Sequence, residues 1–246
     1  MAAEKLAALE LLYRRIEMRD DLSDDEKAAL LSAASEFKRF PAGSTIVQHG
    51  DRPENCTLLV SGFASRFNFT ENGGRQITAI HVGGDFVDLH SLPLQRMDHG
   101  IGALSECVVL LFPHANLIDI TREHPHLTRL LWMLTLLDGA IHRRWLVAMG
   151  RTSATSHMAH LVCELYLRLE AVGLAKDHQM ELPLTQVEMA DTLGISAVHS
   201  NRVLQELRSQ GLLTWEGRHV TINNWDGLVG QAQFDDEFLF REKLPR

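Results

Sequence analysis

Side chains that can read DNA bases stand close together near the C-terminal end, between Ser196 and Arg202. The guanidinium of Arg202 can donate two hydrogen bonds to guanine, and the amide of Asn201 can pair with adenine. The hydroxyls of Ser196 and Ser200 can donate to phosphate oxygens. This combination predicts base and phosphate contacts, provided that the segment is a helix with an open face.

The residues before and within this segment predict two short helices. Thr185-Gln-Val-Glu188 forms a capping-box pattern, so a helix is expected to start there. Gly194 can adopt the left-handed conformation that ends a helix, and Ser196 is a good N-cap for the next one. The two helices are expected to bury Val187, Ala190, Leu193, Val203, Leu204 and Leu207. Two helices joined by a tight glycine turn indicate a helix-turn-helix, whose second helix enters the major groove.

A short hairpin is predicted directly after these helices. Leu212–Trp215 and His219–Ile222 flank the turn Glu216-Gly-Arg218. The unit is therefore expected to be winged, with Arg218 at the tip as a phosphate contact. The candidate DNA-binding residues are Thr185, Gln186, Ser196, Ala197, Val198, His199, Ser200, Asn201, Arg202 and Arg218. An ordinary helical hairpin is the alternative that the two-helix pattern alone leaves open.

Composition and charge limit the class of protein. Of the 246 residues 45% are hydrophobic and 23% are charged, which is typical of a soluble globular protein of one large or two ordinary domains. No apolar run approaches the roughly 18 residues that cross a bilayer, and the N-terminus has no signal-peptide core, so a cytoplasmic location without membrane contact is expected. The net charge of −8 confines any basic DNA-binding surface to a small face.

The N-terminal half predicts two helices and then a small antiparallel barrel or roll. Residues 1–19 have helical apolar spacing, and Ser23 with Glu26 forms a second capping box. Asn72-Gly73 is a hairpin signal. The expected strands are Thr45–Val47, Thr57–Val60, Phe63–Phe69, Gln76–Val82 and Val108–Phe112. Farther along, residues 157–169 predict an amphipathic helix, and residues 173–181 a loop or hairpin.

A long helix is predicted after Pro125, over about Leu127–Met149. Its apolar residues follow a 4-3 spacing that is typical of a helix with a partner helix. The dimer contacts predicted from this stripe are Leu127, Leu131, Leu134, Ile141 and Trp145. Packing of the stripe on its own domain is the alternative.

No pattern in the chain predicts catalysis or a metal site. The three cysteines, Cys56, Cys107 and Cys163, form no C-x-x-C pair, so no sequence-local zinc or iron–sulfur site is expected. They are interpreted as reduced, mostly buried thiols. No Ser/His/Asp order or phosphate-binding loop stands out, so the protein is not expected to be an enzyme.

Over nearly its whole length the chain resembles the Crp/Fnr family of bacterial transcription regulators. The motifs that support the resemblance occur in order: Phe40-Pro-Ala-Gly-Ser-Thr45, Gly50-Asp51, Val60-Ser-Gly62, Gly84-Asp-Phe86, a long helix, and Leu184–Ser196 with its recognition helix. The resemblance implies an α+β fold with an N-terminal antiparallel β-roll of cyclic-nucleotide-binding type, a long dimerisation helix and a C-terminal winged helix-turn-helix domain. The domains are then expected at residues 1–123, 124–150 and 151–246. A homodimer would bind a near-palindromic double-stranded operator, and RNA polymerase is a further expected partner.

The chain departs from this family at the effector pocket. By alignment, Leu89 takes the place of the glutamate that holds the ribose of cyclic AMP, while His99 and Gly100 take the place of the Arg-Ser pair that holds its phosphate. Cyclic AMP is therefore not expected as the effector, because its buried phosphate needs a charged partner. The candidate pocket residues are Asp88, Leu89, His99, Gly100, His142 and Arg143.

No cofactor is predicted. Residues 1–40 contain no cysteine, which argues against the iron–sulfur cluster of the family's oxygen sensors. A cyclic nucleotide and haem stay open, haem because of four histidines in or near the roll: His81, His90, His99 and His114.

The recognition helix also departs, since Ala197 and Val198 stand where cyclic-AMP-type members have Arg-Glu. A glutamate there would accept from cytosine, whereas Val198 can only touch a thymine methyl, so a different operator is expected. The main hypothesis is a homodimeric, sequence-specific DNA-binding regulator with an unknown effector. Two alternatives are a regulator without ligand, switched by abundance or by a thiol such as Cys107, and a cyclic-nucleotide-domain protein that signals by protein contacts without specific DNA binding.

Overall fold

The computed structural model describes residues 2–245, which form two compact units. The first unit contains the described residues up to Asn68, Ile80–Gly139 and the described residues from Phe240 onward. The second contains Phe69–Ala79 and Ala140–Leu239. A hairpin tip thus groups with the C-terminal unit and the tail with the N-terminal one, and the division into domains at residues 1–123, 124–150 and 151–246 stays a prediction. None of the described helices is both long and apolar enough to cross a membrane.

Two helices begin the first unit. Helix α1 spans Ala2–Glu17 and α2 spans Asp24–Ala33. The capping box predicted for α2 is present, since the Ser23 hydroxyl accepts from the backbone N–H of Glu26 and the Glu26 carboxylate accepts from that of Ser23. These reciprocal bonds satisfy amides that have no partner inside the helix.

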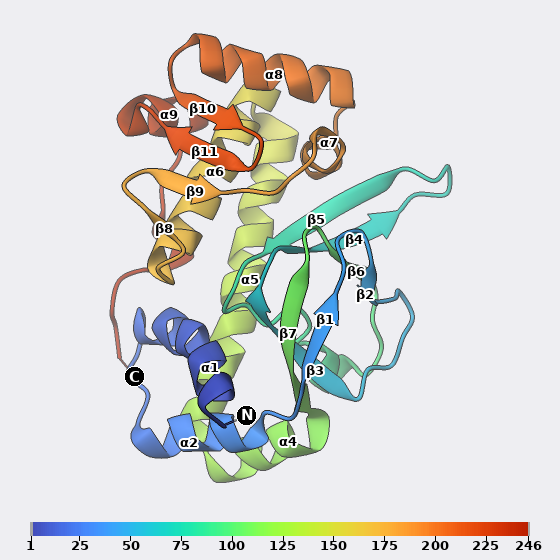
Figure 1. Ribbon diagram of the computed structural model, residues 1–246, viewed down its shortest axis with the longest axis vertical. Helices are drawn as coiled ribbons and strands as arrows, with labels where there is room; N and C mark the ends of the chain where they lie inside the picture. Colours follow the sequence, from blue (N-terminus) through green and yellow to red (C-terminus); the bar gives the residue numbers. More distant parts are fainter. Residues whose placement is uncertain (1, 246) are drawn as a thin grey trace. The chain divides into compact units, whose positions relative to one another are not determined.

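The predicted antiparallel roll is confirmed as two sheets, with strand orders β1-β7-β3 and β2-β6-β4-β5 (Figure 1). The strands are β1 Phe37–Phe40, β2 Thr45–Val47, β3 Asn55–Ser61, β4 Ala64–Phe69, β5 Arg75–His81, β6 Gly100–Ala103 and β7 Cys107–Pro113. Strands β1 and β6 were not predicted. Strand β6 reads Gly-Ile-Gly-Ala and offers few branched or aromatic side chains, so its pairing with β2 and β4 comes from tertiary context.

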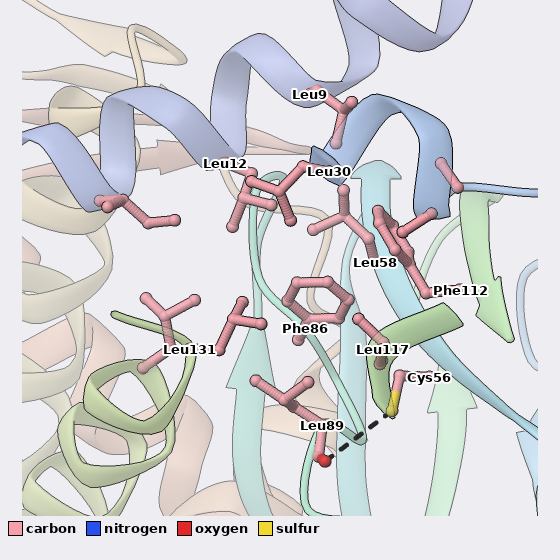
Figure 2. Packing of buried hydrophobic residues seen from close by; sticks show 14 of the residues in the cluster. Leu9, Leu12, Leu30, Cys56, Leu58, Phe86, Leu89, Phe112, Leu117 and Leu131 are labelled. Atoms are coloured by element: carbon pink, nitrogen blue, oxygen red, sulfur yellow. Dashed lines mark hydrogen bonds between the residues drawn. The ribbon is translucent and has the colours of Figure 1, made fainter. Parts of the chain in front are cut away.

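The sheet of β1, β7 and β3 is the middle layer of the first unit, because side chains alternate between its two faces. Leu58, Leu110 and Phe112 belong to a cluster with α1, α2 and α4 (His114–Glu123). Their neighbours Leu59 and Leu111 belong to the cluster against the other sheet. Figure 2 shows the helical side of this core, where Leu58, Phe86 and Phe112 lie among leucines from the helices.

Helix α3 is one turn, Ser91–Leu94, and α5 is the long helix, Pro125–Arg151. The prediction of a helix over 127–149 is confirmed. The helix also continues through Gly150, and the next one, α6 (Ala154–Ala171), starts after the N-cap Ser153.

Helix α6 is the central element of the second unit. It was predicted to be amphipathic, but every residue from Thr155 to Leu169 is buried. Part of its polar surface is paired internally, since the Glu164 carboxylate accepts from the indole N–H of Trp145 at 2.7 Å and from Arg168 at 2.9 Å. Sequence periodicity shows an amphipathic helix here because such polar pairs resemble a solvent face.

The rest of the second unit surrounds α6. Its elements are β8 Ala175–Lys176, β9 Gln179–Glu181, α7 Gln186–Leu193, α8 Ala197–Ser209, β10 Leu213–Glu216, β11 His219–Ile222, α9 Trp225–Ala232 and the 3₁₀ turn η1 Glu237–Leu239. The four strands form one sheet in the order β10-β11-β9-β8. After α9 the rings of Phe234 and Phe238 pack against His160 of α6.

Candidate nucleic-acid interface

Helix α7 begins at the predicted capping box. The Thr185 hydroxyl accepts from the backbone N–H of Glu188, and the Glu188 carboxylate accepts from that of Thr185 at 2.8 Å. The helix ends at Gly194, whose φ of +69° is the left-handed conformation that a residue without Cβ adopts at little cost. Both ends of α7 are therefore fixed by local chemistry.

Helix α8 begins two residues after Gly194. Its N-cap Ser196 accepts from the backbone N–H of His199 at 3.2 Å. The amide of Asn201 donates to the side chain of Gln186 at 3.3 Å, a further link between α8 and the start of α7. The turn thus holds α8 in a fixed orientation to α7 within this unit.

One face of α8 is open. Val198 is 73% exposed, and His199, Arg202 and Gln205 are also exposed. These positions recur at helical spacing, so their side chains share one side of the helix. Figure 1 shows α8 at the outer margin of this unit. Gln205 was not singled out in the sequence, although its spacing of three from Arg202 places it on the same face.

Two predicted positions differ from the structure. Ser200 is only 2% exposed, so it faces the helix core with Val203 and Leu207 and not the open side. Val187 was expected in the buried face of α7, yet it is 58% exposed, while Met189 is buried in its stead. Both errors concern which face of a short helix is buried. A single sequence constrains the rotation of a short helix about its axis poorly, so the expected buried face can be wrong by about one residue.

The other candidate contacts surround the open face. Thr185, Gln186 and Ser196 are exposed at the helix starts, and Ala197 is half-buried in the first turn of α8. The predicted wing is present as the antiparallel pair β10 and β11. Arg218 is exposed in its turn, after Gly217 with a φ of +60°.

The predicted dimer residues on α5 are buried within their own chain. Leu127, Leu131 and Leu134 join the core of the first unit, and Ile141 and Trp145 are buried in the second. They are not available on the surface of the isolated chain. The apolar residues that α5 does expose are Trp132, Leu136, Leu146, Val147 and Met149.

Two of the predicted effector residues belong to the protein core. The Asp88 carboxylate is fully buried and accepts from the backbone N–H and the hydroxyl of Thr57, and burial raises its pKa to about 7. Leu89 lies in the helical-side cluster, where its carbonyl accepts from the Cys56 thiol (Figure 2). The Asp88 carboxylate therefore faces no open effector site, whereas Leu89 also lines a mostly apolar pocket beside α5.

The position expected to receive a cyclic phosphate is occupied by other groups. A Cβ added at Gly100 would lie 2.6 Å from the ring of Phe67, so this ring covers the strand. His99 is buried, and its Nδ1 lies 2.7 Å from a carboxylate oxygen of Asp98. His142 and Arg143, the other two candidates, lie on the part of α5 that belongs to the second unit, where Arg143 is exposed.

The four histidines considered for haem have different surroundings. His81 is buried, with Nδ1 3.5 Å from Asp85. The ring of His114 is within 3.1 Å of the Ser91 hydroxyl. Only His90 and His99 lie ring to ring, with centroids 5.0 Å apart.

Comparisons with known proteins agree with this architecture. The model of the Crp-like helix-turn-helix domain matches residues 156–230, and that of the cyclic nucleotide-binding domain matches residues 37–124. The transcriptional activator protein FnrL of Cereibacter sphaeroides is 27% identical over 218 residues, which cover 87% of each chain. The fumarate and nitrate reduction regulatory protein of Escherichia coli is 24% identical over 213 residues, 86% of this chain and 84% of that one.

Among solved structures, FixK2 from Bradyrhizobium japonicum has the same fold, with a TM-score of 0.72 and 23% identity over 80% of this chain and 96% of that chain. The two matched domains occur in the order that the motifs predicted, and the relatives extend over both. The chain belongs to the Crp/Fnr family of transcription regulators.

Proposed function

We propose that this regulator binds a near-palindromic DNA operator as a homodimer, with the open face of α8 in the major groove of each half-site. The observation that supports this most strongly is the exposed row Val198, His199, Arg202 and Gln205 on a helix whose other side is buried. Arg202 supplies the two-pronged donor that suits guanine, and Val198 the apolar contact that suits a thymine methyl. Asn201, half-exposed and hydrogen-bonded to Gln186, is a candidate for adenine.

Phosphate contacts are proposed from the ends of these elements. The exposed Thr185, Gln186 and Ser196 stand at the two helix starts, where backbone amides favour anions. Arg218 on the wing adds a positive charge. The small number of these positive charges is consistent with the net charge of −8 of the chain.

Dimerisation is proposed through the exposed side of α5. A 4-3 spacing runs along this side just as it does along the buried stripe, one or two residues farther along the chain. Its members are Trp132, Leu136, Gly139, Arg143, Leu146 and Gly150. A second copy of the same helix is the occupant that such a spacing fits, because knobs repeating every 3.5 residues pack on a parallel partner. The five buried residues predicted earlier would then support this side from within.

The effector is proposed to be a molecule other than cyclic AMP. Leu89 lies in the core, Phe67 covers Gly100 and Asp98 lies beside His99, so the residues that the family pattern uses for the cyclic phosphate are replaced, and the nearby guanidinium of Arg66 is already ion-paired with Asp138. Cyclic AMP and cyclic GMP are expected to leave the melting temperature unchanged at saturating concentration, whereas a ligand of the folded state would raise it. No catalytic role is proposed. RNA polymerase as a partner and a cytoplasmic location stay predictions.

The experiment that tests the function is selection of genomic DNA fragments by the purified full-length protein, followed by sequencing. We expect an enriched motif of two inverted half-sites whose centres lie about 10–10.5 base pairs, or a multiple of that, apart. Enrichment of a single half-site would contradict the dimeric arrangement. If no sequence is enriched over the input DNA, the result contradicts specific DNA binding and favours signalling by protein contacts.

A further inference from the structure

Two histidines and one aspartate converge beside strand β6 in the first unit. His90 stands at the start of α3, Asp98 lies in the loop before β6, and His99 immediately precedes the strand. One possible ligand atom from each lies within 4.8 Å of the other two. Among the described residues, no other group of three or more histidine, cysteine or acidic side chains meets this condition.

Both imidazoles present nitrogen atoms that lack a partner. Nε2 of His90 and Nε2 of His99 are buried, and neither makes a hydrogen bond with any described residue. His99 is only 8% exposed, so its ring is held in this position by the protein. A buried polar atom without a partner costs free energy, and coordination of an ion by its lone pair would remove that cost.

Asp98 orients the His99 ring. Its carboxylate oxygen lies 2.7 Å from Nδ1 of His99, so Nδ1 carries the proton in that contact and Nε2 keeps the lone pair. Carboxylates hold metal-binding histidines in this way in many metal sites. The Asp98 side chain is 79% exposed, so this edge of the cluster reaches solvent.

The charges around His90 and His99 also affect the binding of a cation. The guanidinium of Arg66 acts on both histidines, and desolvation together with this charge lowers the pKa of His90 to about 4. The guanidinium of Arg66 is itself ion-paired with Asp138 and donates to the carbonyl of Val87. Asp98 and Asp138 thus offset its charge.

We propose that His90 and His99, with Asp98 orienting the His99 ring, form a site for one divalent transition-metal ion per chain. Two imidazole nitrogens suit Zn²⁺, Ni²⁺, Co²⁺ or Fe²⁺, whereas Mg²⁺ and Ca²⁺ prefer oxygen ligands. The two histidines leave coordination positions for water or a small ligand, as in open metal sites. Sequence patterns do not show the site because His90 and His99 are joined only through the loop after α3 and not by a local motif.

The test is calorimetric titration of the full-length, chelator-treated protein with Zn²⁺ and with Ni²⁺. We expect binding of one ion per chain and no comparable binding of Mg²⁺. His90→Gln and His99→Gln are each expected to weaken the affinity at least tenfold, because each removes a ligand, and Asp98→Asn by about 10- to 100-fold. His49→Gln is the matched control, since it removes an exposed histidine from the same unit.

Asp98→Asn keeps the experiment decisive even if a buried histidine variant does not fold, because Asp98 is mostly exposed. A Co²⁺-loaded protein gives an independent signature, a visible ligand-field absorption that His49→Gln retains and Asp98→Asn weakens. No binding of any of these ions by the folded wild-type chain would overturn the site. Equal binding by wild type, Asp98→Asn and both folded histidine variants would do so too, as it would mark adventitious surface binding. DNA plays no part in this titration, so its outcome is separate from that of the proposed function.

Discussion

Nε of Arg75 lies 2.7 Å from a carboxylate oxygen of Asp191, an ion pair that ties the β4–β5 hairpin to α7, the first helix of the helix-turn-helix. Beside it, the amide of Gln76 donates to the backbone carbonyl of Thr192 at 3.3 Å. These contacts join residues 116 positions apart in the chain. They make the hairpin tip a structural part of the second unit.

A double-mutant cycle on this ion pair is the first prediction. Arg75→Ala and Asp191→Ala should each destabilise the second unit, with a coupling free energy of about 1 kcal/mol, the upper end for surface pairs, because both side chains are mostly covered. The measurement is denaturant unfolding of the single and double variants. Strictly additive effects would show that the ion pair contributes nothing to stability.

The second prediction concerns acid. Burial lowers the pKa of His160 to about 4, from 6.5, and His157 behaves alike. Above pH 6.5 both the folded and unfolded chains hold a neutral ring, so the stability is fully present there. Between pH 6.5 and 4 the unfolded chain takes up the proton and the folded one does not, so stability falls as the pH falls, by about 3 kcal/mol for one such histidine.

The measurement compares wild type with His160→Gln by urea unfolding at pH 7 and pH 4. The variant has no ring to protonate, so its free energy of unfolding relative to wild type should rise by about 3 kcal/mol between the two pH values. His49→Gln, at an exposed position of the other unit, is the control. A difference between wild type and His160→Gln that is the same at both pH values would contradict the assignment.

The third prediction tests the exposed side of α5. Leu146 is 70% exposed, and Leu146→Glu would place two like charges in the proposed helix seam, so dimerisation should weaken at least tenfold. Leu174→Glu removes an exposed leucine outside α5 and should leave association unchanged. Sedimentation equilibrium measures both. If Leu146→Glu associates as tightly as wild type, the seam lies elsewhere.

The sequence predicts well what short-range chemistry decides. The ends of α7 and α8 were predicted correctly because they depend on residues within a few positions of each other. These residues are Thr185 with Glu188, Gly194 and Ser196. Strands with branched or aromatic residues, such as β3 and β7, were predicted for the same reason.

What the sequence could not supply depends on distant partners. The 4-3 stripe on α5 predicts a dimer surface, because nothing in the stripe shows that the indole of Trp145 donates to the carboxylate of Glu164. The convergence of His90 and His99 and the ion pair of Arg75 are likewise products of the fold. Ser200 was placed on the open face because polarity alone does not reveal which serine is buried.

The fourth prediction concerns salt. Each Arg218 that contacts a phosphate releases about one counterion, so Arg218→Ala should flatten the slope of log affinity against log salt by about 2 per dimer. Preference between the operator and an altered operator should stay the same, because a phosphate contact reads no base. Lys176→Ala, at the opposite edge of the wing sheet, is the control. An unchanged slope would remove Arg218 from the interface.

The most direct test of the account compares Arg202→Ala with Arg208→Ala in binding to the selected operator. Both variants lose one exposed arginine from α8, but only Arg202 stands on the open face with Val198 and His199. Fluorescence anisotropy at fixed salt should show a loss of about 1–3 kcal/mol per half-site for Arg202→Ala, with relaxed preference at one base pair, and little change for Arg208→Ala. Equal affinities of the two variants for operator and for unrelated DNA would contradict base reading by this face of α8.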